Sequence, residues 1–422
     1  MGPARIQSVA IVGGGPAGSA LAVHLARAGL RVGLFARERS RGLVVGESLV
    51  PAVVPCLREL GLEEEVRGFA AYKPGASFAT GPAESLHFRF ADFAGRLPGY
   101  AWNVPRDRFD AALLAAAAKS GAHIVPEAAR VERVPGSEGE PEGPRVRLAD
   151  ESRAAAGGFF AEPPDLLVDA SGRLRLLSRL LGLPERAGAR RDTALFAHWE
   201  GVPVEPEGHV FSDRLGHGWC WRIPLPGRVS LGIVVDGSVL TARGSTREEQ
   251  YERTLREEPH LRRLTAGARR LSDVVRYSNY QLTTLRAVGP GWALVGDSFG
   301  FIDPVFSSGL YLTFDGAREL SRAVRRGTRA AFRRYERRQI RHLETWQRVV
   351  DYFYDGRLLA LLRMREELPE NWIGRFFHPH VSRQLPRLFT GESTRGRYGP
   401  WLLDFMIRHA LRGADCESLR ID

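Results

Sequence analysis

Residues 8–18 read Ser-Val-Ala-Ile-Val-Gly-Gly-Gly-Pro-Ala-Gly, and this stretch decides the fold. Its short apolar run is typical of a buried parallel strand. A helical pattern follows over residues 19–28 and ends at Gly29. A GxGxxG turn between strand and helix brings the backbone close to a pyrophosphate, which the helix N-terminus attracts. The stretch therefore predicts a dinucleotide site at Gly13, Gly15, Pro16, Ala17 and Gly18, and the alternative is a glycine-rich turn without a ligand.

A second strand is expected at residues 31–36, and its end normally carries an acid that binds the ribose hydroxyls. Ala36 stands at that place and is followed by Arg37 and Glu38. Either Glu38 takes over from a shifted position, or the ribose is held without a carboxylate. Arg37 and Glu38 are therefore candidate cofactor-binding residues.

The composition is that of a globular protein with more than one domain. The chain has 422 residues, of which 44% are hydrophobic and 26% charged, and these values exclude a disordered or fibrous protein. No apolar run reaches the roughly 18 residues that a membrane span needs. The three cysteines, Cys56, Cys220 and Cys416, are far apart, which argues against a disulfide framework or a structural zinc site and predicts a cytoplasmic protein.

The basic residues are almost all arginines. Lys and Arg number 60 against 49 Asp and Glu, a net charge of +11, yet the only lysines are Lys73 and Lys119. A lysine in such a chain indicates a position where a guanidinium cannot substitute. Nine arginines between Arg322 and Arg341 accompany a single acid, Glu336, which predicts either a solvated helix face or a surface for an acidic partner. The sequence contains no basic motif interleaved with aromatic residues, so it does not indicate binding to nucleic acid.

Further along the chain, the pattern changes twice. Residues 135–144 form a Pro/Gly/Glu-rich loop, and strand-like runs at residues 193–199, 219–224 and 229–235 predict an inserted antiparallel sheet. From Leu310 to Met364 the pattern is mostly helical.

Three later motifs extend the dinucleotide prediction to a flavin. Residues 168–172 (VDASG) follow a strand-like pair, Gly296-Asp297 closes another strand, and residues 303–309 (DPVFSSG) open a helix. Together with Arg106, they resemble the glutathione-reductase-like flavoproteins over most of the chain up to residue 325. The resemblance implies that Asp297 holds the ribityl chain of FAD. It also implies that the helix after Pro304, with Gly309 and Leu310, presents its N-terminus to the isoalloxazine ring.

This resemblance sets the expected architecture. It implies an α/β protein with a discontinuous, Rossmann-type FAD-binding domain (residues 1–185 and 280–325). An antiparallel-sheet substrate domain (186–279) is inserted, and a mostly helical C-terminal region (326–422) follows.

Within that group the chain resembles the flavin-dependent halogenases. Residues 219–224 (WCWRIP) match the WxWxIP pattern of that family, and residues 46–51 match its GES segment, which supplies Glu47 and Ser48. Lys73 falls where the family carries its catalytic lysine. The resemblance implies that reduced FAD and O2 oxidise chloride or bromide, bound at the amides of Ser308 and Gly309, to hypohalous acid, which Lys73 relays to an aromatic substrate. We interpret Trp219 and Trp221 as a wall between flavin and substrate, and core packing is the alternative.

Two positions depart from the family pattern. Tryptophan halogenases carry a glutamate before the Ser-Ser-Gly-type segment, where this chain has Phe306. A phenol or pyrrole stabilises a charged ring intermediate through its own heteroatom, so Phe306 favours such a substrate, either free or tethered to an acidic carrier protein. Residues 78–81 (FATG) stand where relatives often have F-x-W-G.

Three alternatives stay open at this point. They are an NAD(P)H-dependent aromatic hydroxylase, a geranylgeranyl-reductase-like enzyme, and a non-catalytic flavoprotein that binds a partner through its arginine-rich helix. Only one GxGxxG occurs, so we expect no nicotinamide site and a separate flavin reductase. After Asp351, the residues Tyr352, Phe353, Tyr354 and Trp372 either line a substrate entrance or pack in the core.

Overall fold

The computed structural model describes residues 6–38, 42–81, 84–93, 95–136, 143–278, 281–364, 386–411 and 415–421. Trp372 and part of the predicted loop at residues 135–144 lie outside these ranges.

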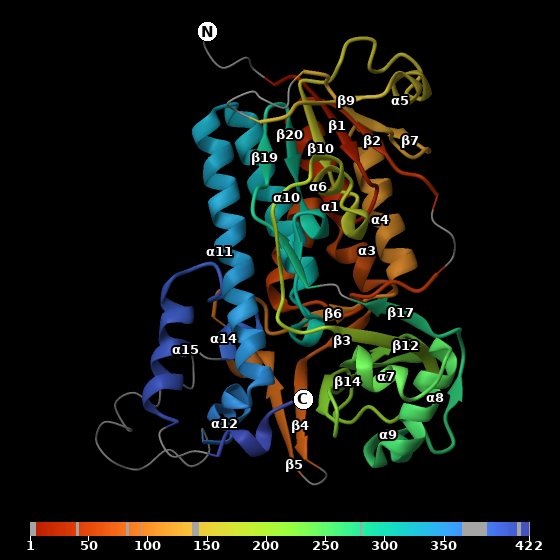
Figure 1. Cartoon of the computed structure of the whole chain (residues 1–422), viewed down its shortest axis with the longest axis vertical. Coiled ribbons are helices and arrows are strands. Elements are labelled where there is room, and N and C mark those ends of the chain that lie inside the picture. Colours follow the sequence, from red (N-terminus) through yellow and green to blue (C-terminus); the bar gives the residue numbers. More distant parts are fainter. Residues whose placement is uncertain are drawn as a thin grey trace.

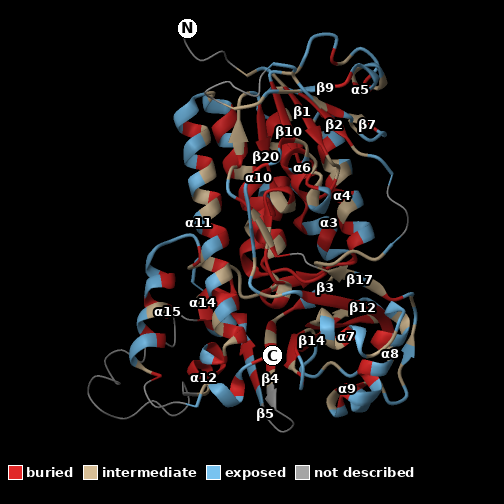
Figure 2. Ribbon diagram, in the orientation of Figure 1, coloured by how far each residue is buried: buried red, intermediate tan, exposed pale blue. Residues whose placement is uncertain are grey.

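The N-terminal strand lies inside a six-stranded sheet. The strand order is β19 (Val288–Gly289), β20 (Trp292–Leu294), β10 (Leu166–Asp169), β1 (Ser8–Val12), β2 (Arg31–Phe35) and β7 (His123–Val125). All neighbours pair in parallel except β19 and β20. Figure 2 shows the central strands buried, as expected for a parallel sheet with both faces covered. The predicted buried strand is confirmed.

The turn after β1 is closed by contacts that only glycine permits. Gly13 has a φ of +114°, and a Cβ on Gly18 would lie 1.9 Å from the Gly13 carbonyl oxygen. Helix α1 (Pro16–Ala26) follows and begins three residues before the predicted start. Proline suits the first helical turn, where its missing N–H costs nothing. The predicted strand–turn–helix unit is therefore confirmed.

Two long helices pack with α1 against the sheet. They are α4 (Arg106–Lys119) and α10 (Gly309–Arg326), which both contact α1. The first residues of α1 and of α10 both line the cavity described below.

A second sheet has eight strands. Its order is β16 (Arg269–Arg270), β12 (Asp192–Glu200), β15 (Arg228–Asp236), β14 (Trp219–Leu225), β13 (Val210–Arg214), β4 (Gly75–Gly81) and β5 (Glu84–Arg89), with β17 (Val275–Ser278) also paired to β12. The three strands predicted in this region are confirmed as β12, β14 and β15.

The second sheet also recruits an earlier part of the chain. Strand β4 pairs in parallel with β13, although β4 and β5 lie in the stretch that the sequence assigns to the FAD-binding domain. Pairing between segments so far apart leaves no local pattern, so the sequence did not reveal it. How the chain divides into domains stays a prediction.

The remaining strands form small sheets. They are β3 (Ala71–Lys73) with β6 (Ala101–Asn103), β8 (Val131–Arg133) with β9 (Val146–Leu148), and β11 (Glu185–Ala187) with β18 (Leu282–Thr284) and β21 (Gly300–Phe301). The short helices are α2 (Val54–Leu60), α3 (Glu63–Arg67), α5 (Asp150–Ala155), α6 (Leu176–Leu181), α7 (Gly237–Thr241), α8 (Arg247–Glu257) and α9 (Pro259–Thr265). The 3-10 turns are η1 (Pro51–Val53), η2 (Phe90–Phe93), η3 (Gly172–Leu174), η4 (Gly296–Ser298), η5 (Pro304–Phe306) and η6 (Glu417–Leu419).

The described residues of the C-terminal region are mostly helical, as predicted. It contains α11 (Arg329–Tyr354), α12 (Arg357–Met364), α14 (Pro386–Phe389) and α15 (Tyr398–His409). In Figure 1, α11 runs down one side of the molecule from the six-stranded sheet to the level of β4 and β14. This path brings the end of α11 to the second sheet.

The arginines between Arg322 and Arg341 are exposed, apart from the half-buried Arg338. Arg322 and Arg338 both pair with the buried Glu319.

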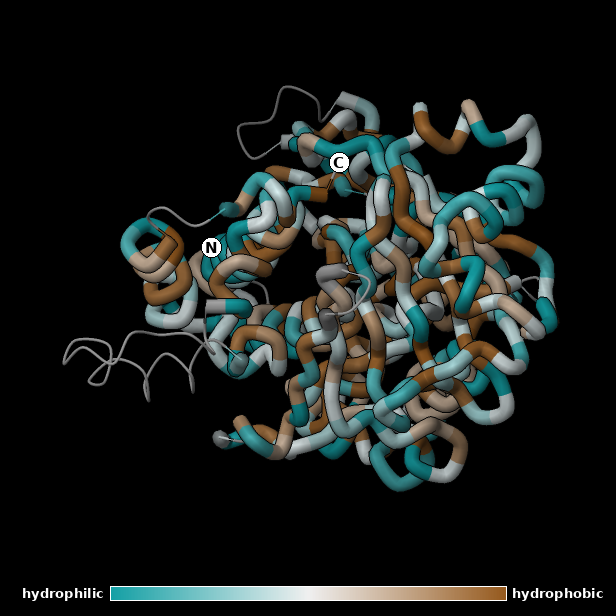
Figure 3. The backbone as a smooth tube through the Cα atoms, turned by 90° about the horizontal axis from the view of Figure 1, so that it is seen from below, coloured by the Kyte–Doolittle hydropathy of each residue, from teal (hydrophilic) through white to brown (hydrophobic). Residues whose placement is uncertain are grey.

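None of the described helices combines the length and the apolarity needed to cross a bilayer, and Figure 3 shows hydrophilic residues interrupting the apolar ones along the chain. The three cysteines are free, and the cytoplasmic location stays a prediction.

Candidate active site

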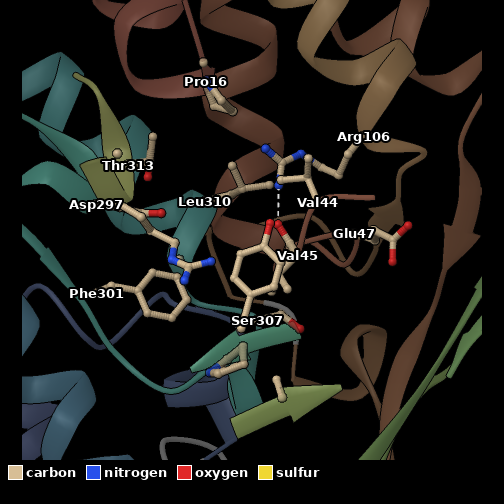
Figure 4. Close-up of a pocket in the computed structure, with 18 of the residues that line it drawn as sticks. Pro16, Val44, Val45, Glu47, Arg106, Asp297, Phe301, Ser307, Leu310 and Thr313 are labelled. Atoms are coloured by element: carbon tan, nitrogen blue, oxygen red, sulfur yellow. Dashed lines mark hydrogen bonds between the residues drawn. The ribbon is translucent and has the colours of Figure 1, made fainter. Parts of the chain in front are cut away.

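A cavity of about 590 Å³ lies between the two sheets, at the N-termini of α1 and α10. Figure 4 shows part of its wall, with Pro16 on one side, Ser307 on another and Leu310 between them. Twelve of the residues predicted from the sequence line it: Gly15, Pro16, Ala17, Glu47, Ser48, Arg106, Trp219, Trp221, Asp297, Pro304, Gly309 and Leu310.

Several predicted residues do not line this cavity. Gly13 and Gly296 lie in turns next to lining residues, and Gly18 lies in the first turn of α1. Ser308 lies between the lining residues Ser307 and Gly309, and Lys73 contacts the lining residue Ser48. Arg37 and Glu38 are exposed and also stand outside the lining. The structure therefore does not bring a carboxylate from the end of β2 to the cavity, and their role in ribose binding stays a prediction.

One end of the cavity is suited to a diphosphate. Residues 15–17 begin α1, whose first N–H groups have no partners within the helix. The Arg106 guanidinium lies opposite and is 8% exposed. Its Nε donates to Asp110 Oδ1 at 2.9 Å, and its Nη1 donates to the Val45 carbonyl (Figure 4). A helix N-terminus and a fixed cation at one end attract an anion.

The middle of the cavity combines a carboxylate with aromatic rings. Gly296 has a φ of +68°, and this turn directs Asp297 to the cavity wall. Tyr277 and Phe301 line the wall as well, and the Arg173 guanidinium lies 4.0 Å from the Tyr277 ring centroid. A phosphate-binding end, a carboxylate and flat apolar walls fit the diphosphate, ribityl chain and ring system of FAD. The sequence analysis did not single out Tyr277, Phe301 or Arg173. Tyr277 lies in no motif, whereas Arg173 and Phe301 lie just outside the motifs at residues 168–172 and 303–309.

Both motif tryptophans of β14 stand in the cavity wall. The indole of Trp219 is 1% exposed and donates from Nε1 to the Tyr354 hydroxyl at 2.8 Å. Trp221 donates from Nε1 to Ser230 Oγ at 3.2 Å. A Cβ on Gly232 would lie 2.2 Å from the Trp221 ring, so the glycine makes room for the indole. The wall position agrees with our interpretation of the pair, whose catalytic role stays a prediction.

Lys73 is buried, with 2% of its surface exposed, and ends strand β3. Its Nζ donates to the Leu49 carbonyl and lies within hydrogen-bond distance of Ser48 Oγ, both at 2.8 Å. Burial lowers the pKa of the amine to about 7. Strand β3 thus brings Lys73 to Ser48 of the GES segment, 25 residues earlier in the sequence.

Glu47 has a partner that the sequence analysis missed. His198 Nε2 lies 2.7 Å from Glu47 Oε1, and both side chains are buried. His198 stands on β12, far from Glu47 in sequence, and a lone histidine in a strand carries no signal. The imidazole fixes a carboxylate that faces the cavity.

Phe306 lies in an apolar cluster. It is 5% exposed, and its ring centroid lies 6.1 Å from Phe78, 5.6 Å from Phe353 and 5.3 Å from Phe389. Phe78 belongs to the other departing motif, FATG. Phe78 matches the phenylalanine of the F-x-W-G pattern, so this cluster surrounds the departure at position 306, together with the Trp346 ring at 6.5 Å.

The turn after Phe306 leads into α10. Ser307 has a φ of +56°, and Gly309 begins the helix at the cavity wall. Ser308 is fully buried, and its Oγ has no hydrogen-bond partner within the described part of the chain. A buried hydroxyl of this kind at the start of an 18-residue helix suits a small anion.

Comparisons with known proteins agree with this arrangement. A family model described as tryptophan halogenase matches residues 93–357, and one described as FAD binding domain matches residues 7–154. The chain is 32% identical to a sulochrin halogenase of Aspergillus terreus over 77% of its length and 64% of the relative's. It is 31% identical to a tryptophan 2-halogenase of Chondromyces crocatus, covering 82% and 67% of the two chains.

Two further relatives span more of their own length. A 1H-pyrrole-2-carbonyl-[peptidyl-carrier protein] chlorinase of Pseudomonas fluorescens is 27% identical over 82% of this chain and 83% of its own. The solved structure of the myxobacterial chondrochloren halogenase, an FAD-dependent halogenase, superposes with a TM-score of 0.72 at 25% identity, covering 96% and 97% of the two chains. The chain spans about two thirds of the length of the first two relatives.

We expect His198→Phe to weaken FAD binding about tenfold or more, because hydrogen bonds to charged groups contribute about 1.5–3 kcal/mol. Titration of the apoprotein with oxidised FAD, followed by flavin fluorescence, measures this. His260→Phe is the matched control, since His260 pairs with Asp213 outside the cavity lining. Equal affinity in wild type and His198→Phe would show that the Glu47 contact does not support the cofactor.

Proposed function

The chain belongs to the tryptophan halogenase family, and from this premise we propose that it is a flavin-dependent halogenase acting on an electron-rich aromatic ring. The observation that carries the proposal is the buried amine of Lys73, 2.8 Å from Ser48 Oγ, since Ser48 itself lines the cavity that fits FAD. A buried amine beside a redox cofactor has the position and the reactivity of a halogen carrier.

The cavity would hold FAD with its diphosphate at the start of α1 and its ring system toward Trp219, Trp221 and the start of α10. Bound in the reduced state, FAD supplies with O2 the oxidising power that converts a halide to hypohalous acid. We place the chloride or bromide at the backbone amides of Ser308 and Gly309. The helix N-terminus and the unpartnered Ser308 Oγ stabilise an anion there.

Lys73 would then receive the oxidised halogen in one of two ways. Its ammonium can donate a hydrogen bond to hypohalous acid and polarise it. Alternatively, its neutral amine can take the halogen, forming an N–halogen bond and releasing water. The ring then takes the halogen and gives up one proton, and the amine is restored. With a pKa of about 7, both forms are populated near neutral pH.

The tryptophan wall keeps these steps apart. Trp219 and Trp221 belong to β14 of the second sheet and line the cavity, and each is held by a hydrogen bond from its indole N–H. A substrate ring on the far side meets only the small oxidant that passes by. This separation favours halogenation over the direct oxygen transfer of an aromatic hydroxylase.

Phe306 supports a phenol or pyrrole as the substrate. Position 306 carries an aromatic ring among other aromatic rings and so supplies no carboxylate to a positively charged ring intermediate. A substrate ring with its own heteroatom can stabilise that charge itself. The exposed arginines of α10 and α11 support a tethered substrate, because they offer an acidic carrier protein a complementary field. We place the reaction in the cytoplasm, with reduced flavin delivered by a separate reductase.

We expect NADPH alone to leave the bound flavin oxidised, because the sequence contains only one GxGxxG turn. Stopped-flow absorbance of the anaerobic holoprotein measures this, and a flavin reductase added to the same mixture is the positive control. Product whose mass shows halogen should form only with reductase, O2 and halide together. Rapid reduction by NADPH would support the hydroxylase alternative instead.

We expect Lys73→Ala to lower halogenation at least about 100-fold, in the range of a lost proton-transfer or carrier group, with O2-driven flavin reoxidation changed by less than about twofold. Lys119→Ala is the matched control, because it removes the other lysine, exposed at the end of α4. Ser48→Ala separates the role of the amine from that of its hydrogen bond.

The same assay at different pH values distinguishes the two carrier modes. We expect halogenation to rise from pH 6 to pH 8 with a midpoint near 7, because burial lowers the amine pKa to about 7 and the neutral amine is the nucleophile. A fall over that range would assign the work to the ammonium form. Equal halogenation rates in wild type and Lys73→Ala would exclude Lys73 from the mechanism.

We expect a free phenol or pyrrole to be halogenated well and tryptophan at least about tenfold less well. We also expect a carrier-bound ring to be turned over faster at low salt than at high salt, because salt screens surface charges. Both expectations are tested by measuring product formation with each substrate at 20 mM and 300 mM added salt. This change shortens the Debye length from ~20 to ~6 Å. Efficient turnover of tryptophan would contradict the argument from Phe306, and equal turnover of free and tethered rings would remove the carrier.

A further inference from the structure

We propose that Tyr354 is a positioning residue, whose hydroxyl ties the tryptophan wall to the loop that leads into the halide site; this inference rests on the proposed function. Tyr354 is the last residue of α11 and is 6% exposed. It accepts the indole N–H of Trp219 at 2.8 Å and lies 2.8 Å from Asp303 Oδ2. One phenol hydroxyl therefore contacts both Trp219 in the cavity wall and Asp303, which directly precedes the lining residue Pro304.

The direction of these two hydrogen bonds follows from their chemistry. An indole N–H is a donor only, so the tyrosine oxygen must accept from Trp219. The hydroxyl hydrogen is then left for Asp303, whose carboxylate accepts it. Burial raises the pKa of Asp303 to about 7. The hydrogen bond from Tyr354 acts in the opposite direction and stabilises the carboxylate form.

Asp303 controls the loop that follows it. Its Oδ1 accepts the backbone N–H of Val305 at 3.0 Å and caps the 3-10 turn η5. Directly after this turn come Ser307, with a φ of +56°, and Ser308 at the start of α10. Pro304, Val305, Ser307 and Gly309 all line the cavity. The Tyr354–Asp303 bond therefore restrains the backbone on which the proposed halide site is built.

The ring of Tyr354 is held independently of its hydroxyl. The Arg190 guanidinium lies 4.0 Å from the ring centroid and pairs with Asp192 at 2.7 Å. The backbone N–H of Ile421 donates to the Tyr354 carbonyl at 2.8 Å. Loss of the hydroxyl alone would therefore leave the ring and the end of α11 in place, which makes the hydroxyl separable by mutation.

Without that hydroxyl, Trp219 Nε1 and Asp303 Oδ2 each lose one hydrogen bond. The Trp219 indole is freed to turn, and Asp303 no longer draws the loop toward α11. Halide would bind less tightly, and the oxidising power of reduced flavin and O2 would be lost as hydrogen peroxide, since the two electrons of the flavin and the two protons pass to O2. The consequence is uncoupling of flavin oxidation from halogenation.

The test compares Tyr354→Phe with Tyr352→Phe, the neighbouring tyrosine, whose hydroxyl donates to Asp404 at 2.9 Å near the surface. We expect Tyr354→Phe to lower halogenated product per reduced flavin at least fivefold, to raise peroxide equally, and to raise the KM for bromide more than it lowers kcat. We expect Tyr352→Phe to behave as wild type. Unchanged coupling and unchanged KM in Tyr354→Phe would overturn the proposal.

Two measurements need no turnover and so separate this inference from the proposed function. Bromide titration of the oxidised holoprotein, followed by flavin absorbance, should give a Kd at least fivefold higher in Tyr354→Phe. In the apoprotein labelled with 5-fluorotryptophan, the 19F resonance of Trp219, assigned with Trp219→Phe, should move in Tyr354→Phe and stay in Tyr352→Phe. If wild type halogenates nothing, the proposed function fails, and an unmoved Trp219 resonance still overturns the positioning role.

Discussion

The close approach of α1 to the turn that precedes it is the constraint on which the rest of the structure depends. A Cβ on Gly18 would lie 1.9 Å from the Gly13 carbonyl oxygen, and a Cβ on Gly13 would lie 2.3 Å from the carbonyl oxygen of Ala170 in the neighbouring strand segment. Only glycine permits this contact of β1, α1 and β10. It sets the N-terminus of α1 at the carboxyl edge of the parallel sheet, where open α/β folds bind their ligands.

The packing of α10 on α1 gives the cavity its second anion site. Both helices begin at the same cavity, with residues 15–17 at the N-terminus of α1 and Gly309 with Leu310 at the N-terminus of α10. Each N-terminus carries a partial positive charge, which would attract diphosphate at α1 and a halide at α10. In the proposed function, the start of α1 would therefore bind the diphosphate of FAD, and the start of α10 would bind the halide that the cofactor oxidises.

Local motifs identified the segments, whereas contacts between distant segments stayed hidden. The turn at Gly13, the pair Gly296-Asp297 and the WxWxIP strand were readable because each combines a turn or strand with a fixed spacing. The pairing of β4 with β13, the His198–Glu47 contact and the bonds of Tyr354 join residues far apart in sequence. No periodicity records such contacts, so a single sequence cannot show them. Lys73 lay between these cases, since its identity was conspicuous but its burial beside Ser48 was not.

The burial of Lys73 explains why this arginine-rich chain retains a lysine there. Taking a cation out of water costs several kcal/mol. Within the described residues, the hydrogen-bond partners of the amine are Ser48 Oγ and the Leu49 carbonyl, neither of which is a carboxylate. An amine meets that cost by losing its proton, and its pKa falls to about 7. A guanidinium stays charged under all such conditions and presents no lone pair to an electrophile. The site therefore selects lysine through titration, and the same loss of a proton that makes burial tolerable also makes the nitrogen a nucleophile beside the flavin cavity.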